Sequence, residues 1–148
     1  MRISAKGRYA MAAMIYMTQN YNNGNYIKVI NISEKLGISN IYLEQVFSLL
    51  KRGGLVTSFK GSQGGYLLTR TPQQITAYDI LSSVETSLFE NTEETVSEKV
   101  PEINAAMQKL VFNVLDEVAK TTLKRTTLYD LVQEAEKHTA DKNLMFFI

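Results

Sequence analysis

Residues 32–68 constrain the fold of this chain most, because two short helical patterns there lead directly into a glycine-rich hairpin. Ile32 and Leu36 lie four residues apart on one face of the first pattern, and Gly37 then provides a helix stop. Ser39 is a typical cap for the helix that follows. The spacing therefore predicts two helices separated by a three-residue turn.

The second of these helices is predicted over residues 40–52 and has one apolar side. Its apolar positions recur at i, i+3, i+4 and i+7, the period of a core-facing helical stripe. They are Leu43, Val46, Phe47 and Leu50. A short helix, a turn containing Gly37 and a second capped helix form a helix-turn-helix pattern.

A β-hairpin is predicted immediately after this pattern. Residues 55–59 and 66–68 read as strands, and the glycine-rich residues 60–65 form the turn between them. A hairpin that directly follows the second helix is the wing of a winged-helix domain. The predicted fold class is therefore mainly α with a small β-hairpin wing.

The rest of the first half supports one domain over residues 1–86. Ser4 caps a largely apolar helix over 5–21, residues 26–28 are predicted as a short strand, and Thr76 with Asp79 opens a fourth helix. Residues 87–98 are polar and acidic, which predicts a loop or linker. Residues 99–148 are expected to hold a long dimerisation helix, a last helix and a tail.

The long helix has two possible starts, near residue 97 or at Pro101, and is expected to end at about 120. Its apolar positions recur every three or four residues and predict a homodimer interface. They are Ile103, Met107, Leu110, Val114 and Val118. Thr127 caps a last helix to about 137. The apolar residues 144–148 should pack either on this subunit or on its twin.

Charge is distributed unevenly along the chain. Residues 1–80 hold nine basic and three acidic residues, a net charge of +6, and the remainder has a net charge of −5. Such a basic half is typical of a segment that meets a polyanion. Chance segregation of surface charges is the alternative.

Several function classes find little support in the composition. The chain has no cysteine, which excludes disulfides, thiolate metal sites and cysteine nucleophiles. His138 is the sole histidine, and the carboxylates are scattered, so neither catalytic residues nor a metal site are predicted. The glycine pair at 64–65 opens a strand, whereas a nucleotide-binding loop opens a helix. The apolar stretch 9–17 is too short to span a bilayer, so a soluble, cytoplasmic protein is expected.

Double-stranded DNA is the polyanion that this fold predicts as partner. A helix-turn-helix presents the start of its second helix to base edges, while wing amides and helix N-termini suit phosphates. The candidate DNA-binding residues are Arg2, Ser4 and Lys6 in the first helix, Ser39, Asn40, Tyr42, Glu44, Gln45, Ser48 and Arg52 in the recognition helix, and Lys60, Gly61, Ser62, Gln63, Gly64 and Gly65 in the wing. Glu44 either accepts a hydrogen bond from a cytosine amino group or pairs with a neighbouring lysine. The wing glycines either let phosphate approach or merely serve the turn.

The first 86 residues resemble the Rrf-two (Rrf2) family of transcriptional regulators. The resemblance lies in the opening residues 1–10, in 42–45 (YLEQ), in the wing residues 60–68 and in 75–80 (ITAYDI). It implies a homodimer, joined through the long helix, that binds a palindromic operator. It also places Ser39, Tyr42, Glu44 and Gln45 in the major groove and Lys60 with its glycines in the minor groove.

Two departures from the family pattern are visible. Lys60 stands where many members have arginine, and residues 87–98 lack the three cysteines that hold an iron–sulfur cluster in cluster-sensing members. No cofactor is therefore predicted. Residues 126–131 and 145–148 resemble the cluster-free repressors of cysteine metabolism, which implies sulfur-metabolism genes and cysteine synthase as a partner protein. The alternative is an interaction module that binds a metabolic enzyme without specific DNA binding.

Overall fold

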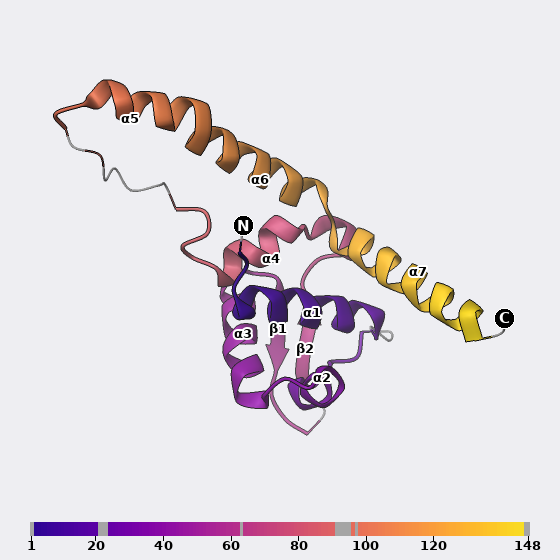
Figure 1. Cartoon of the computed structure of the whole chain (residues 1–148). Coiled ribbons are helices and arrows are strands. Elements are labelled where there is room, and N and C mark those ends of the chain that lie inside the picture. Colours follow the sequence, from indigo (N-terminus) through magenta and orange to yellow (C-terminus); the bar gives the residue numbers. More distant parts are fainter. Residues whose placement is uncertain (1, 21–23, 63, 91–95, 97, 147–148) are drawn as a thin grey trace.

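The computed structural model describes residues 2–20, 24–62, 64–90, 96 and 98–146 (Figure 1). A helical unit containing a two-stranded hairpin carries a long helical arm that projects away from it. The elements are, in chain order, α1 (Ala5–Gln19), α2 (Val29–Leu36), α3 (Asn40–Arg52), β1 (Val56–Phe59), β2 (Gly65–Leu68), the 3₁₀ turn η1 (Pro72–Gln74), α4 (Ala77–Val84), α5 (Pro101–Met107), the π-helical turn η2 (Gln108–Phe112), α6 (Asn113–Arg125) and α7 (Leu128–Phe146).

The core lies where α1, α2, α3 and α4 meet beside the hairpin. The predicted apolar stripe of α3 is fully buried there, together with Met14 and Met17 of α1 and Ile80 of α4. Leu128, the first residue of α7, is also fully buried in this cluster. The last helix therefore packs on the same core as the helix-turn-helix.

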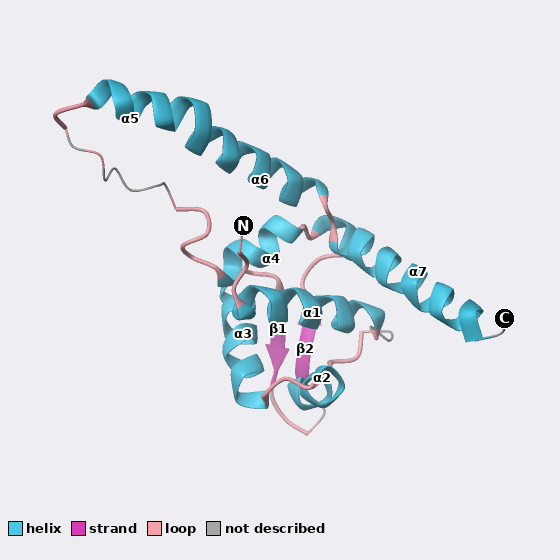
Figure 2. Ribbon diagram, viewed as in Figure 1, coloured by secondary structure: helices cyan, strands magenta, loops and turns pink. Residues whose placement is uncertain are grey.

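The predicted hairpin is present, and it is antiparallel. Its two strands lie side by side (Figure 2). Val56 pairs with Leu68 and Phe59 with Gly65. Residues 26–28 form no separate strand; instead Ile27 and Tyr66 exchange two backbone hydrogen bonds of 2.9 Å in an isolated bridge. The prediction of a strand at 26–28 was therefore wrong in extent, because one residue alone reaches the hairpin edge.

Three helix ends differ from the predicted ones. α1 ends at Gln19, since the backbone of Asn20 leaves the helical conformation (φ −109°, ψ 17°) and its side-chain Nδ2 donates to Tyr16 O at 2.8 Å. The arm begins at Pro101, one of the two predicted starts, and runs to Arg125 because the backbone turns extended only at Thr126. α7 continues past residue 137 to Phe146, since no glycine or proline interrupts that stretch.

The starts of α4 and α7 are built alike and are tied together. Thr76 with Asp79, and Thr127 with Asp130, each form reciprocal hydrogen bonds of 2.9–3.1 Å between side chain and backbone. Ala77 N–H donates to Thr126 O at 2.8 Å, and Leu128 N–H donates to Ile75 O at 2.7 Å. This bridge fixes the junction of α6 and α7 to the start of α4.

Replacing Thr127 by alanine is expected to lower the free energy of unfolding by about 1 kcal/mol, because the substitution removes an N-terminal cap. Urea denaturation followed by circular dichroism at fixed protein concentration measures the change. Thr139→Ala, at an exposed position within the same helix α7, is the matched control and should cause no loss, since its hydroxyl bonds only to Ala135 O of its own helix. Equal losses in both variants would show that the cap contributes nothing.

The end of α7 leaves apolar side chains uncovered. Leu144 is 63% and Met145 is 76% exposed, so these two do not pack on their own subunit. Residues 147 and 148 of the same apolar run lie outside the described residues. No helix in the described ranges is both long and apolar enough to cross a membrane.

Candidate nucleic-acid interface

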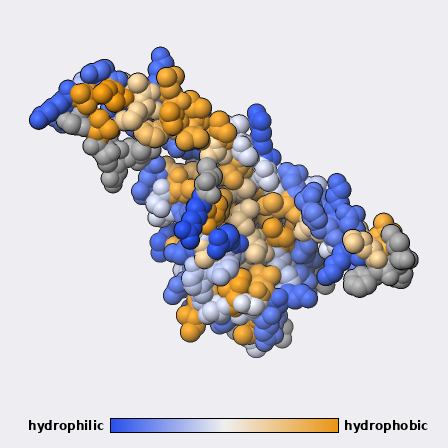
Figure 3. All heavy atoms as spheres, in the orientation of Figure 1, coloured by the Kyte–Doolittle hydropathy of each residue, from blue (hydrophilic) through white to orange (hydrophobic). Residues whose placement is uncertain are grey.

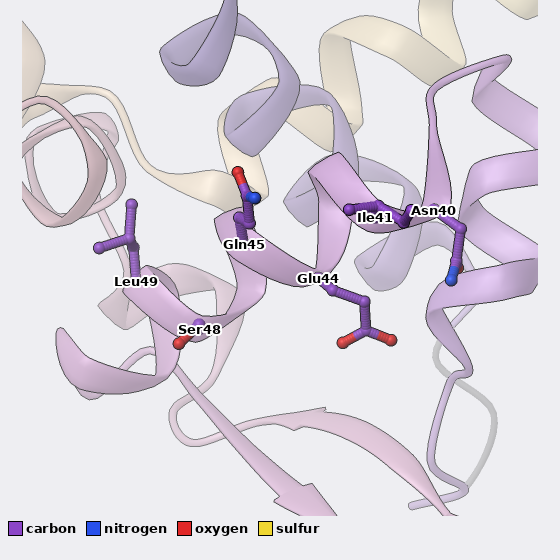
Figure 4. A pocket seen from close by; sticks show the side chains of 6 residues that line it. All are labelled: Asn40, Ile41, Glu44, Gln45, Ser48 and Leu49. Carbon is purple, nitrogen blue, oxygen red and sulfur yellow. The ribbon is translucent and has the colours of Figure 1, made fainter.

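The recognition helix α3 buries one side and offers the other to solvent. Its buried stripe faces α1 and α4, while Glu44, Gln45 and Ser48 are exposed on the outer side (Figure 4). Arg52, at the end of the helix, is exposed as well. Ser39 is exposed just before the helix, and its Oγ accepts a hydrogen bond from Tyr42 N–H at 3.4 Å. The four exposed side chains and Ser39 are thus free to meet a partner along one face.

Asn40 and Tyr42, two further candidates, are only partly available. The Tyr42 ring packs edge-on against the Tyr9 ring with centroids 5.4 Å apart. The Asn40 Oδ1 atom is buried and has no hydrogen-bond partner among the described residues. Both residues therefore contribute to packing at the start of α3, and the surface that they offer to a partner is smaller than that of Gln45.

The wing is attached directly to the recognition helix. The Phe47 ring from α3 lies against the Tyr66 ring from β2, with centroids 4.7 Å apart. The Lys51 ammonium donates to Ser58 Oγ at 2.7 Å. Burial, and secondly the negative charge of Glu44, raise the pKa of the Tyr66 hydroxyl, which stays protonated at neutral pH. Helix and wing thus form one continuous surface.

Glu44 has no ion-pair partner among the described side chains. The lysine pairing that the sequence left open is therefore absent from this part of the structure. Its carboxylate remains exposed and faces outward on α3. A free carboxylate at this position can accept a hydrogen bond from a base amino group.

The wing tip presents Lys60, Gly61 and Ser62 to solvent. Gly64 is buried, and its N–H donates to Gly61 O at 3.0 Å, so this amide serves the turn. A side chain at Gly64 would collide with the Phe59 carbonyl oxygen. Gly65 likewise lies against the Ile27 backbone. Gly64 thus closes the turn and Gly65 begins β2, while phosphate contact by the wing remains a prediction. Gln63 lies outside the described residues.

Arg2, Ser4 and Lys6 lie at the start of α1, as predicted. The carboxylate of Glu85 lies there as well, which the sequence did not indicate. Ser4 Oγ caps the helix by accepting from Gly7 N–H at 3.2 Å. The Ser4 N–H donates to Glu85 Oε1 at 2.7 Å, and its hydroxyl donates to the same atom. Glu85 is 81 positions away in the chain, so no local pattern could point to it. The cations therefore surround an N-terminus that already binds an anionic side chain.

The residues do not fit an iron–sulfur cluster. No cysteine is available as ligand, and no group of three His, Cys, Asp or Glu side chains in the described part of the chain is placed to hold a metal ion. His138 pairs with Glu134 at 3.1 Å on the exposed surface of α7. An iron–sulfur cluster ligated by cysteine therefore has no part in the function of this surface.

These features define a winged helix-turn-helix protein, with an exposed polar recognition helix beside a cationic wing. The family model described as Rrf2, iron-dependent transcriptional regulator, matches residues 3–134. The chain belongs to the Rrf2 family, whose members are DNA-binding transcriptional regulators and not enzymes.

Individual relatives agree with this assignment. The chain is 44% identical over 88 residues to the HTH-type transcriptional regulator IscR of Cronobacter sakazakii. The matched residues make up 60% of this chain and 54% of that protein. The chain thus matches about half the length of such curated relatives. It is 30% identical to CymR, the global cysteine regulator of B. subtilis, with a TM-score of 0.73 over 90% of this chain and 98% of that one. It is also 30% identical to T. potens IscR, with a TM-score of 0.68 over 93% of this chain and 90% of that one.

Proposed function

We propose that the protein is a homodimeric repressor that binds a palindromic operator. The observation that carries the proposal is the exposed polar face of α3 with the Lys60 wing tip attached to it. In this arrangement Gln45 and Glu44 read base edges in the major groove, and Lys60 approaches phosphates or the minor groove. Such a regulator works on the chromosome, so we assign it to the cytoplasm.

The arm formed by α5, η2 and α6 supports a dimer. Ile103, Leu110, Val114 and Val118 are between 49% and 71% exposed, and Met107 is half-buried. Val111, 47% exposed, lies beside them, whereas Leu115, 57% exposed, borders a depression formed with Leu88 and Phe89 of its own subunit. In Figure 3 hydrophobic residues gather along this arm. Soluble monomers rarely leave a contiguous apolar patch of this kind open, and a second arm offers a matching surface.

Regulation of cysteine or sulfur metabolism is the pathway we assign within this function. It is supported by the similarity to CymR over 90% of the chain. Without a bound cofactor, the signal would arrive through a partner protein, for which cysteine synthase is our candidate. The exposed end of α7, with Leu144 and Met145, is available for such a contact.

Selection of bound sequences from a random duplex library tests the proposal directly. Enrichment of a palindrome by the purified protein at moderate salt is the expected result. A palindrome found upstream of sulfur-assimilation genes supports the pathway. If the library gives no motif, the selection is repeated with cysteine synthase present. A second failure would favour an interaction module that binds an enzyme without specific DNA contacts.

Two substitutions should separate phosphate contact from base reading. Lys60→Ala is expected to weaken binding to operator and scrambled duplexes alike and to reduce the salt dependence by about one counterion per protomer. Gln45→Ala should weaken operator binding by roughly 1–3 kcal/mol and leave scrambled DNA nearly unaffected. Fluorescence anisotropy at several salt concentrations distinguishes the two. Equal losses on both duplexes would remove Gln45 from base reading.

A further inference from the structure

An apolar side chain lies in the middle of the polar outer face of α3. Ile41 is 74% exposed, although it stands within the first turn of a well-packed helix. Since the helix repeats every 3.6 residues, Ile41 lies opposite the buried stripe and shares its side with Gln45 and Ser48. Its side chain therefore contributes little to the packing of the described subunit.

Ile41 also borders a shallow depression on the outer side of the helix. The depression has a volume of about 530 Å³ and is lined by Asn40, Ile41, Glu44, Gln45, Ser48 and Leu49 (Figure 4). Apart from Ile41 and the half-buried Leu49, these side chains are polar. Ile41 and Leu49 together offer too little apolar area to dock an apolar protein surface, but they match a small apolar group set among hydrogen-bonding atoms.

The major groove of DNA contains one such group. Thymine carries a C5 methyl beside the hydrogen-bonding atoms of the base edges. We propose that Ile41 contacts the methyl group of a thymine in each half-site and so selects that base at a position which hydrogen bonds alone do not specify. This inference rests on the proposed function, since it requires α3 to lie in the major groove.

The effect of a methyl contact can be estimated. Burial of one methyl-sized group corresponds to roughly a four-fold change in Kd. Two half-sites contacted by two protomers would give about fifteen-fold when both methyls are removed together. Both changes are within reach of a direct titration.

Replacement of thymine by deoxyuridine tests the inference, since it removes the methyl and keeps every hydrogen-bonding atom. The thymines of the selected operator are replaced one symmetric pair at a time. At one position the wild-type protein should lose about fifteen-fold, whereas Ile41→Ala should bind the thymine and uracil duplexes equally. Ile30→Ala, which removes an isoleucine that is 46% exposed on α2, is the control and should retain the wild-type response.

The possible failures are distinguishable. If the wild-type protein prefers its operator over scrambled DNA but no uracil position separates it from Ile41→Ala, the methyl contact is wrong and the proposed function stands. A selected half-site without thymine leads to the same conclusion. If no duplex is preferred, with or without cysteine synthase, the proposed function fails and the inference fails with it.

Discussion

Leu110→Glu is expected to convert the protein to a monomer and to weaken operator binding at least about 100-fold. Leu110 is 71% exposed in the centre of the apolar face of the arm. In the proposed dimer this substitution would bury an unpaired carboxylate from each subunit, at a cost of about 3–5 kcal/mol for each. A monomer presents one recognition helix and loses the second half-site. Light scattering coupled to size exclusion measures the mass, and anisotropy measures the Kd.

Because Leu110 is exposed, its substitution leaves the subunit core intact, so a loss of dimer mass would not come from unfolding of the subunit. Ala105→Glu adds the same charge to the same arm at an exposed position on its opposite side, since Ala105 lies two residues, about 200° of helical rotation, from both Ile103 and Met107. This control should remain a dimer and bind normally. A Leu110→Glu protein that stays dimeric at micromolar concentration would exclude the arm as the dimer interface.

Phe47→Ala is expected to lower the free energy of unfolding by about 3–5 kcal/mol, the range for phenylalanine truncation in a packed core. Phe47 is fully buried and lies between the α3 core and the Tyr66 ring. A loss of this size is a large part of the stability of a small protein. Urea denaturation at fixed protein concentration measures it, since dimerisation makes apparent stability concentration-dependent.

Phe59 provides the matched comparison for this second prediction. It lies in β1, the strand paired with the one that carries Tyr66, is 58% exposed and packs on the Tyr26 ring, with centroids 5.3 Å apart. Phe59→Ala should therefore cost much less than Phe47→Ala. If the two variants unfold at the same urea concentration, the Phe47–Tyr66 contact does not hold helix and wing together.

Features coded by neighbouring residues could be predicted from the sequence. The stripe from Leu43 to Leu50 repeats with the helical period, and Ser39 and Gly37 mark the ends of the two helices. The wing follows from β-branched and aromatic residues around a glycine-rich turn. These signals are local, and tertiary packing did not override them.

Features that depend on distant residues could not be predicted. Nothing near Ser4 indicates that its N–H and hydroxyl meet Glu85, and nothing near Tyr42 indicates that its ring meets Tyr9. The full length of α7 could not be predicted either, because its polar residues carry no strong apolar period. The helical period alone places Ile41 on the outer face of α3, but only the structure shows that no other part of the described subunit covers its side chain, which is 74% exposed.

The bridge between Thr76 and Thr127 has a geometric consequence for DNA binding. It joins the residues that directly follow the arm to the start of α4, the helix that packs against α3, so two backbone hydrogen bonds hold the base of the arm beside the recognition helix unit. From Pro101 to Arg125 the arm is about 37 Å long, close to the roughly 34–36 Å of one turn of DNA. In the proposed dimer, the length of the arm and the point where the two arms cross determine the distance between the two recognition helices. That distance in turn determines which spacing of half-sites the protein binds.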